Sequence, residues 1–319
     1  MRGALLAVRA VIVAGLALAR SFVVGCGEKI NAGLMMFMHR QGLLLCSYKI
    51  DLTDFQGVTA GNTATLRLPA GPGSPTYDLI RLELAGGWTP AHIEWVRGKI
   101  NGRIFLDEGA GAEIQDRDDF RGIFTDNSFL NLDFTEPKAR NGAAEQLVAS
   151  LPGNLCQSIT FEVKIAAGAP GGGSIKASAN YRPPTNNPFV RKLFALPQAF
   201  AAAGTDGSPN ILYLPVGQQG GRIKRIWLKE TTAGNITAAQ IRIANNVIHN
   251  VTRAKLENDQ KRNGLVPQAG LFVLDFIEDG NLASLLDTSA APSVELRLVT
   301  TAGELVKAYI EYIDPIARL

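Results

Sequence analysis

The chain has 319 residues, of which 46% are hydrophobic and 19% charged, and its formal net charge is +3. This composition excludes an intrinsically disordered chain and is enough for two domains of ordinary size. The 32 basic residues are spread along the sequence without a clustered Lys/Arg stripe, so no specific nucleic-acid binding is expected. Cys26, Cys46 and Cys156 are widely spaced, which argues against a disulfide framework or a zinc site and predicts free thiols.

Residues 1–46 differ in kind from the rest, because they contain all four methionines of the chain. A basic start and an apolar run at residues 10–19 resemble a secretion signal, and residues 23–26 resemble a lipoprotein cleavage box that ends at Cys26. Two other interpretations are open. Translation begins at one of the methionines at positions 35, 36 and 38, so that the preceding residues are mis-assigned, or the segment is an arm that faces a membrane.

The sequence after this segment has the alternation of half-buried β-strands. Ile159, Phe161 and Val163 share one face of a predicted strand, while Thr160 and Glu162 point the other way. Short strands of this kind, separated by turns that use many of the 33 glycines and 16 prolines, favour an all-β protein. We expect two tandem jelly-roll sandwiches, the first over residues 47–181 and the second over residues 208–319.

A repeated order of segments supports this duplication. Seven pairs of segments follow one another in the same order with slowly drifting offsets, as insertions and deletions in loops would produce. The pairs are residues 66–71 with 212–217, 80–84 with 224–228, 89–93 with 237–241, 132–134 with 274–276, 147–151 with 282–286, 159–168 with 294–303, and 175–181 with 305–312. Each half therefore carries the same series of strands.

Two kinds of helical segment are expected beside the strands. Each half has one short helical excursion, at residues 141–151 and 280–287. Between the halves, residues 182–207 are predicted to be a linker that contains an amphipathic helix over residues 188–203, interrupted by Pro197.

The side chains that carry catalysis are sparse in this sequence. The three histidines, His39, His92 and His249, lie far apart, and no nucleophile, zinc or phosphate-loop motif accompanies them. We therefore expect neither an enzyme nor a bound cofactor.

One acidic segment carries a weak metal hypothesis. Asp116, Asp118 and Asp119 follow further carboxylates from position 107 onward, and carboxylate oxygens are ligands that calcium prefers. No EF-hand spacing is present, and arginines at positions 117 and 121 interrupt the cluster. A solvated loop or a contact between chains is the alternative interpretation, with structural calcium a weaker possibility.

Short stretches in a fixed order also resemble a known family. They are residues 60–62, 66–69, 89–96, 101–103 and 306–312. Over about residues 48–319 the chain is similar to the major capsid proteins of corticoviruses, membrane-containing bacteriophages of the double jelly-roll lineage. The resemblance implies a homotrimer with six barrels that tiles an icosahedral shell over an internal lipid membrane, with calcium bound in some members.

The resemblance also implies where such a protein works and what it contacts. The expected location is the capsid of the virion, which is assembled in a host bacterial cell. The gene belongs either to a free virus or to a prophage. The expected partners are further copies of the chain, neighbouring trimers, minor capsid and vertex proteins, and the membrane beneath the shell.

Two other functions remain as alternatives. An exported bacterial lipoprotein or carbohydrate-binding β-sandwich is suggested by the signal-like start and Cys26, but sugar sites need exposed aromatic rings, and the chain has only Trp88, Trp95 and Trp227. A glycan hydrolase on the same fold would need paired carboxylates that the sequence does not identify.

Overall fold

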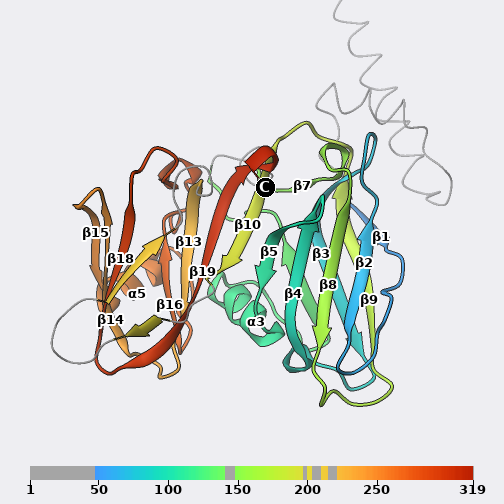
Figure 1. Ribbon diagram of the computed structural model, residues 1–319, viewed down its shortest axis with the longest axis horizontal. Helices are drawn as coiled ribbons and strands as arrows, with labels where there is room; N and C mark the ends of the chain where they lie inside the picture. The colour runs from blue at the N-terminus through green and yellow to red at the C-terminus, as the bar shows by residue number, and fades with distance from the viewer. Residues whose placement is uncertain (1–46, 141–147, 197–199, 203–209, 215–220, 319) are drawn as a thin grey trace, which may run out of the picture. The chain divides into compact units, whose positions relative to one another are not determined.

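The computed structural model describes residues 47–140, 148–196, 200–202, 210–214 and 221–318. The three interpretations of residues 1–46 concern a segment outside these residues and remain predictions. The described residues form the two jelly rolls that the alternation predicts, so the all-β fold class is confirmed (Figure 1).

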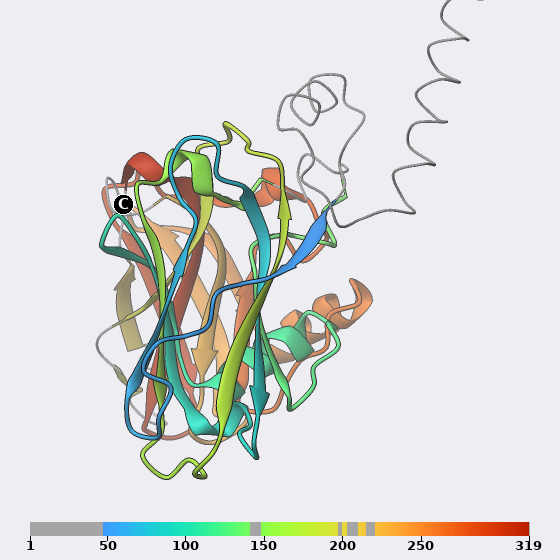
Figure 2. The ribbon, with the colours of Figure 1, turned by 90° about the vertical axis from the view of Figure 1, so that its right-hand side faces the viewer.

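The first barrel consists of two facing sheets (Figure 2). One sheet has the order β1-β9-β3-β6, with β7 paired to β3, and the other contains the order β5-β4-β8-β2. Alternate residues of these strands point into a shared apolar core in which Ile80, Phe105 and Phe161 are fully buried. The strands are β1 (Tyr48–Asp51), β2 (Thr63–Leu68), β3 (Thr76–Ala85), β4 (Ile93–Ile100), β5 (Arg103–Glu108), β6 (Phe129–Asp133), β7 (Leu151–Pro152), β8 (Ile159–Ile165) and β9 (Ser174–Arg182).

The second barrel repeats this strand order. Its sheets run β10-β19-β13-β16, with β17 paired to β13, and β15-β14-β18-β12. Its core is a separate cluster that includes Ile226, Leu296 and Ile310. The strands are β10 (Phe189–Ala195), β11 (Phe200–Ala202), β12 (Asn210–Leu214), β13 (Arg222–Lys229), β14 (Ile236–Ile243), β15 (Asn246–Thr252), β16 (Leu271–Asp275), β17 (Leu286–Asp287), β18 (Val294–Thr300) and β19 (Glu304–Pro315). Strand for strand, β1 therefore corresponds to β10 and β9 to β19.

The β-bulges correspond as well as the strands. The register of β3 against β9 shifts around Asp78, and that of β13 against β19 shifts around Lys224. Likewise, the register of β4 against β8 shifts after Ile93, and that of β14 against β18 shifts after Ile236. Because a bulge adds one unpaired residue at a defined position, the shared bulges align the two barrels residue by residue.

The predicted linker helix is wrong. Residues 189–195 form strand β10, which pairs antiparallel with β19 over its whole length and touches β5 in parallel at Leu193 and Leu106 (Figure 1). The apolar residues at 188–203 gave a helix-like spacing because β10 is buried on both faces, which removes the alternation of a half-buried strand. The second jelly roll thus begins with β10 and not at residue 208.

Of the two predicted helical excursions, most of the first, residues 141–147, lies outside the described residues and stays a prediction, while its last residue belongs to strand β7. The second excursion contains only the 3-10 turn Leu282–Ser284, followed by β17. The described residues also contain two α-helices that were not predicted, α3 (Gly111–Phe120), after β5, and α5 (Arg253–Arg262), after β15, at equivalent places of the two barrels.

Two of the seven repeat pairs were aligned with the wrong shift. Strand pairing places Ile80 opposite Leu132 and Ile226 opposite Leu274, so these two isoleucines correspond, and the predicted match of residues 80–84 is shifted by two. The match of residues 89–93 is shifted further, because Ile93 corresponds to Ile236. A two-residue shift keeps every side chain on its own face of the sheet, so alternation alone does not detect it.

Candidate functional site at the junction of the two barrels

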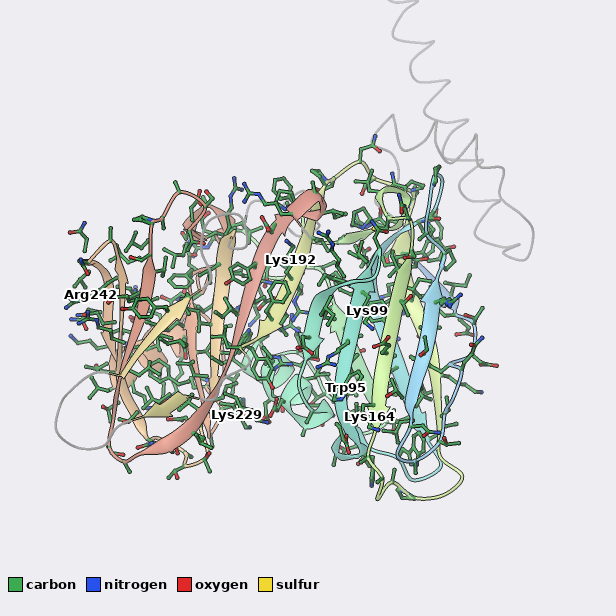
Figure 3. All side chains as sticks on the ribbon, viewed as in Figure 1. Trp95, Lys99, Lys164, Lys192, Lys229 and Arg242 are labelled. Carbon is green, nitrogen blue, oxygen red and sulfur yellow. The ribbon has the colours of Figure 1, made fainter. Side chains whose placement is uncertain are left out.

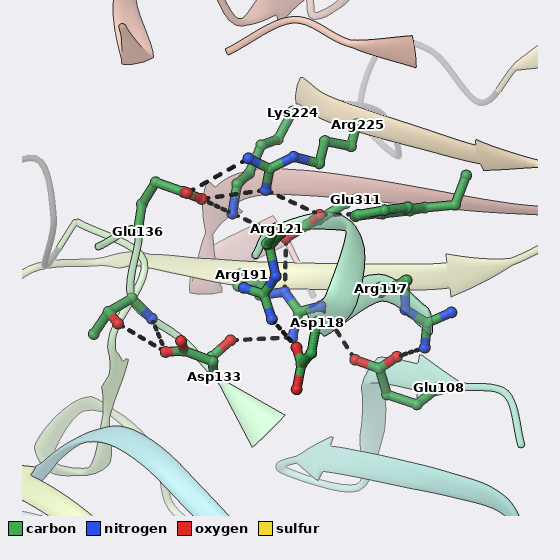
Figure 4. A network of polar contacts seen from close by, with 12 residues as sticks. Glu108, Arg117, Asp118, Arg121, Asp133, Glu136, Arg191, Lys224, Arg225 and Glu311 are labelled. Atoms are coloured by element: carbon green, nitrogen blue, oxygen red, sulfur yellow. Dashed lines mark hydrogen bonds and ion pairs between the residues drawn. The ribbon is translucent and has the colours of Figure 1, made fainter. Parts of the chain in front are cut away.

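Charged side chains are buried where the two barrels meet (Figure 4). They come from β5, from α3 and its C-cap and from the segment after β6 on the side of the first barrel, and from β10, β13, β16 and β19 of the second. The members are Glu108, Arg117, Asp118, Arg121, Glu136, Arg191, Lys224, Arg225, Asp275 and Glu311, and we call them the junction network.

Glu311 of β19 lies at the centre of the junction network. Its Oε1 accepts hydrogen bonds from Arg191 Nε at 2.8 Å and from Lys224 Nζ at 3.0 Å, and its Oε2 accepts one from Trp227 Nε1 at 3.2 Å. Burial by itself would raise the pKa of Glu311, but the cations of Lys224, Arg191 and Arg225 outweigh burial and hold the pKa well below its usual range. This carboxylate is therefore ionised inside the protein.

Arg225 and Lys224 link the second barrel to the segment after β6. Arg225 Nε donates to Asp275 at 2.7 Å, and Lys224 Nζ lies 2.5 Å from Glu136 Oε2. Burial opposes ionisation of Glu136, yet Arg225 and Lys224 together lower its pKa to about 2. For Asp275 the balance is reversed, because complete burial raises its pKa more than Arg225 lowers it.

Glu108 at the end of β5 connects the network to helix α3. It forms ion pairs with Arg117 of α3 and, at 3.2 Å, with Arg191 of β10. The guanidinium of Arg117 also lies over the ring of Tyr309, 5.1 Å from its centroid. A cation of the second barrel and one of the helix thus share a single carboxylate of the first.

Helix α3 packs on the outer face of the sheet that contains β13 and β19. The rings of Phe120 and Trp227 meet edge to face at a centroid distance of 5.3 Å. At the rim of this contact, Lys229 Nζ lies 2.5 Å from Asp116, and the hydroxyl of Tyr309 donates to Glu113 at 2.6 Å. Apolar and charged contacts therefore fix the two barrels against each other.

Buried charges occur at equivalent bulges of the two barrels. In β13 the bulge lies at Lys224, and both Lys224 and Arg225 are buried because this strand is covered on both faces. The equivalent bulge in β3 carries Asp78, which accepts from Arg182 Nε at 2.8 Å and from Ser150 at 2.9 Å. Equivalent bulges thus carry a buried acid, Asp78, in the first barrel and a buried base, Lys224, in the second.

The three calcium candidates are not brought together. Asp116 pairs with Lys229, Asp118 pairs with the buried Arg121, and Asp119 accepts a hydrogen bond from Thr125 at 2.7 Å. Burial raises the pKa of Asp118 despite the nearby Arg121. Within the described ranges, no group of three or more His, Cys, Asp or Glu side chains has a metal-binding arrangement.

The other residues singled out from the sequence have ordinary surroundings. Trp88 and Trp227 are buried, and the guanidinium of Arg97 lies over the ring of Trp95 at 4.4 Å, so none of these rings is an open platform for a sugar (Figure 3). Cys156 is a buried free thiol, and burial raises its pKa to about 11. Burial also lowers the pKa of His249.

Most of the junction network gave no signal in the sequence. Arg117, Asp118 and Arg121 belong to the acidic segment that the sequence analysis considered, but the other members are charged residues in strands and loops, where the usual expectation is a solvated surface.

No helix among the described residues is long and apolar enough to span a bilayer.

Comparisons with solved structures find the same fold in viral coats. The major capsid protein P2 of bacteriophage PM2 is similar with a TM-score of 0.74 and 19% identity, over 85% of this chain and 98% of that chain. The major capsid protein of Sulfolobus turreted icosahedral virus has a TM-score of 0.61 at 15% identity, over 84% and 96% of the two chains. The PBCV-1 virus capsid model has a TM-score of 0.56 at 12% identity, over 84% and 93%.

The comparison of sequences is more specific. No curated protein matches the chain at a significant level. Two family models do match: the N-terminal domain of viral coat protein P2 over residues 49–182 and its C-terminal domain over residues 190–316. Since the two models together cover most of the sequence, the chain belongs to the P2 family of viral coat proteins, which form the capsid of the virion and are structural proteins, not enzymes.

Proposed function

We propose that this chain is a major capsid protein whose homotrimers, each with six barrels, tile an icosahedral shell over an internal membrane. The observation that carries this proposal is the identical strand order of the two barrels, including their bulges. Two barrels of one fold offer similar lateral surfaces, so three chains can form a nearly hexagonal tile from a single gene product. Such a tile makes similar contacts with all its neighbours in a shell.

The junction network supports the same function. A tile must keep a fixed spacing between its barrels, and a buried network of ion pairs restricts how two surfaces can dock. Glu108 of the first barrel pairs with Arg191 of β10, and Glu136 after β6 pairs with Lys224 and Arg225 of β13. Sliding of the barrels would therefore break several pairs at once. The proposed partners are neighbouring trimers, minor capsid and vertex proteins, and the lipid membrane known from the corticovirus coats that the sequence resembles.

The mass of the purified protein in solution tests the trimer. Light scattering over a range of concentrations should give about 102 kDa, three times the 34.1 kDa of one chain. Mutation of an exposed residue in the 3-10 turn between β7 and β8, Leu155→Lys, should leave this mass unchanged. A protein that stays at the mass of one chain at every concentration would contradict the proposal.

A further inference from the structure

Strand β15 of the second barrel has one edge without a neighbour among the described residues. It pairs only with β14 and ends its sheet, whereas its counterpart β5 pairs with β4 on one side and with β10 on the other. An exposed strand edge offers a row of backbone hydrogen-bonding groups and is a template for pairing with another strand. The first barrel has a matching edge at β1, which within the described part of the chain pairs only with β9.

The registers show which residues correspond at these edges. Leu106 lies opposite Gly98 in β4, and His249 lies opposite Ile241 in β14. In both pairs of strands the register shifts directly after this residue of β4 or β14. Leu106 therefore corresponds to His249, and the bulged residue Phe105 corresponds to Ile248.

The other side of the contact aligns in the same way. Tyr48 lies opposite Tyr181 in β9, and Lys192 lies opposite Tyr312 in β19. Since those two tyrosines are equivalent, Leu193 of β10 corresponds to Lys49 of β1. The pair Leu193 and Leu106, which joins the two barrels within one chain, thus has the counterpart Lys49 and His249.

Exposure distinguishes the occupied edge from the free one. Leu106 and Leu193 are fully buried at the contact within the chain, and Phe105 is buried in the core of the first barrel against Phe161. Their counterparts are more exposed: Lys49 is exposed, Ile248 is 45% exposed, and His249 is half-buried beside Phe276. Ile50, next to Lys49, is 47% exposed. Val247 adds a further apolar side chain, 49% exposed, to the same edge. Apolar residues on a free strand edge are typical of a surface that another chain covers.

The geometry points to a second copy of this chain as the partner: we propose that β15 of one copy pairs in parallel with β1 of the next, with Lys49 opposite His249. The inference rests on the proposed trimer and specifies its interface. Each sheet β15-β14-β18-β12 would continue into β1-β9-β3-β6 of the neighbour, as β5-β4-β8-β2 continues into β10-β19-β13-β16 within the chain. A contact of this heterologous kind, repeated three times, closes a ring and leaves no β15 edge free.

Charge on the surfaces beside these edges agrees with the pairing. Within the chain, α3 of the first barrel covers the outer face of the sheet that contains β13. The counterpart of α3 is α5, and the counterparts of β13 and β16 are β3 and β6. In the assembly, α5 would therefore cover the outer face of β3 and β6 of the neighbour. The exposed residues of α5 have a net basic charge: Lys255, Lys261 and Arg262 against Asp259. The face that it would meet has a hollow of about 370 Å³ whose lining has a net acidic charge: Asp118, Asp126 and Asp133 against Arg81 alone. A basic helix and an acidic hollow are complementary.

A disulfide between copies tests the register directly. The variant Lys49→Cys with His249→Cys is made with Cys26 and Cys46 replaced by serine, and is oxidised under mild conditions. A disulfide requires the two Cα atoms to lie within about 7 Å. Non-reducing gels should show covalent dimers and trimers. The matched control is Lys49→Cys with Asn246→Cys, which moves the second cysteine three residues, or about 10 Å, along β15, and should stay uncrosslinked.

A second variant tests the interface without a disulfide. Ile248→Lys places a charge where the neighbour would bury an apolar side chain, so the trimer should dissociate at least tenfold more readily, while Leu155→Lys should not change its dissociation. A trimer that survives Ile248→Lys and gives no disulfide between Lys49→Cys and His249→Cys would overturn the inferred interface and leave the proposed trimer intact. A chain that is monomeric before any substitution would overturn both.

Discussion

The carboxylate of Glu311 holds in place two cations that join the barrels. It is 1% exposed and accepts hydrogen bonds from Arg191 and Lys224 of its own barrel. These two cations pair in turn with Glu108 and Glu136 on the side of the first barrel. Removing a charge from water is costly, and only complete pairing with good geometry offsets that cost. The network is therefore better understood as a device that fixes the docking of the barrels than as a large source of stability.

Replacement of Glu311 should reveal this dependence. Glu311→Gln keeps the shape of the side chain but leaves Lys224, Arg191 and Arg225 short of one negative charge in a buried place, so the free energy of unfolding should fall by about 3–5 kcal/mol. Denaturant titration at fixed protein concentration measures the change.

A surface ion pair provides the control for this substitution. Glu162→Gln removes the same charge from the ion pair of Glu162 with Lys99. The side chains of Glu162 and Lys99 are 23% and 29% exposed, so the free energy of unfolding should fall by less than about 1 kcal/mol. Equal losses for the two variants would mean that the junction network does not behave as a buried, coupled unit.

At the scale of elements, the sequence predicted most of the strands. Alternating residues such as Ile159, Phe161 and Val163 identify a strand with one buried face. The predicted match of residues 66–68 with 212–214 is confirmed, because β2 pairs with β8 as β12 pairs with the equivalent strand β18. Strand β10 was missed because Val190, Arg191, Lys192 and Leu193 are all buried, so no alternation is left.

The junction network was not predictable from the sequence for a related reason. Arg191, Lys224 and Glu311 lie far apart along the chain, and each looks like an ordinary surface charge on an amphipathic strand. Only the pairing of β10, β13 and β19 in one sheet brings them together. The acidic segment at α3 did attract attention in the sequence, but its carboxylates bind arginine, lysine and threonine side chains of this chain.

The role of β10 as a strand buried on both faces is testable by a truncation. Leu193→Ala removes apolar contacts from a fully buried side chain, so the free energy of unfolding should fall by about 2–5 kcal/mol. Leu305→Ala on β19, where the side chain is 61% exposed, should change it by less than about 0.5 kcal/mol. Similar, small effects of the two substitutions in thermal or denaturant unfolding would contradict the burial of β10.

At the scale of the whole molecule, the duplication allows the same kind of contact between barrels to form within one chain and between neighbouring chains. The contact of β5 with β10 is satisfied within the chain, and the same arrangement at β15 and β1 is available to further copies. A coat protein has to reach high local concentration without uncontrolled aggregation, and a strand edge that is covered only by the correct neighbour serves that need. Family membership as a viral coat protein and the internal repeat thus lead to the same assembly.

Electron cryomicroscopy of the purified assembly, at a resolution that separates strands, tests this account most directly. We predict a threefold particle in which β1 of each chain lies parallel to β15 of the next, with α5 over the outer face of β3 and β6. A particle without threefold symmetry, or a trimer in which β1 and β15 both face solvent, would contradict it.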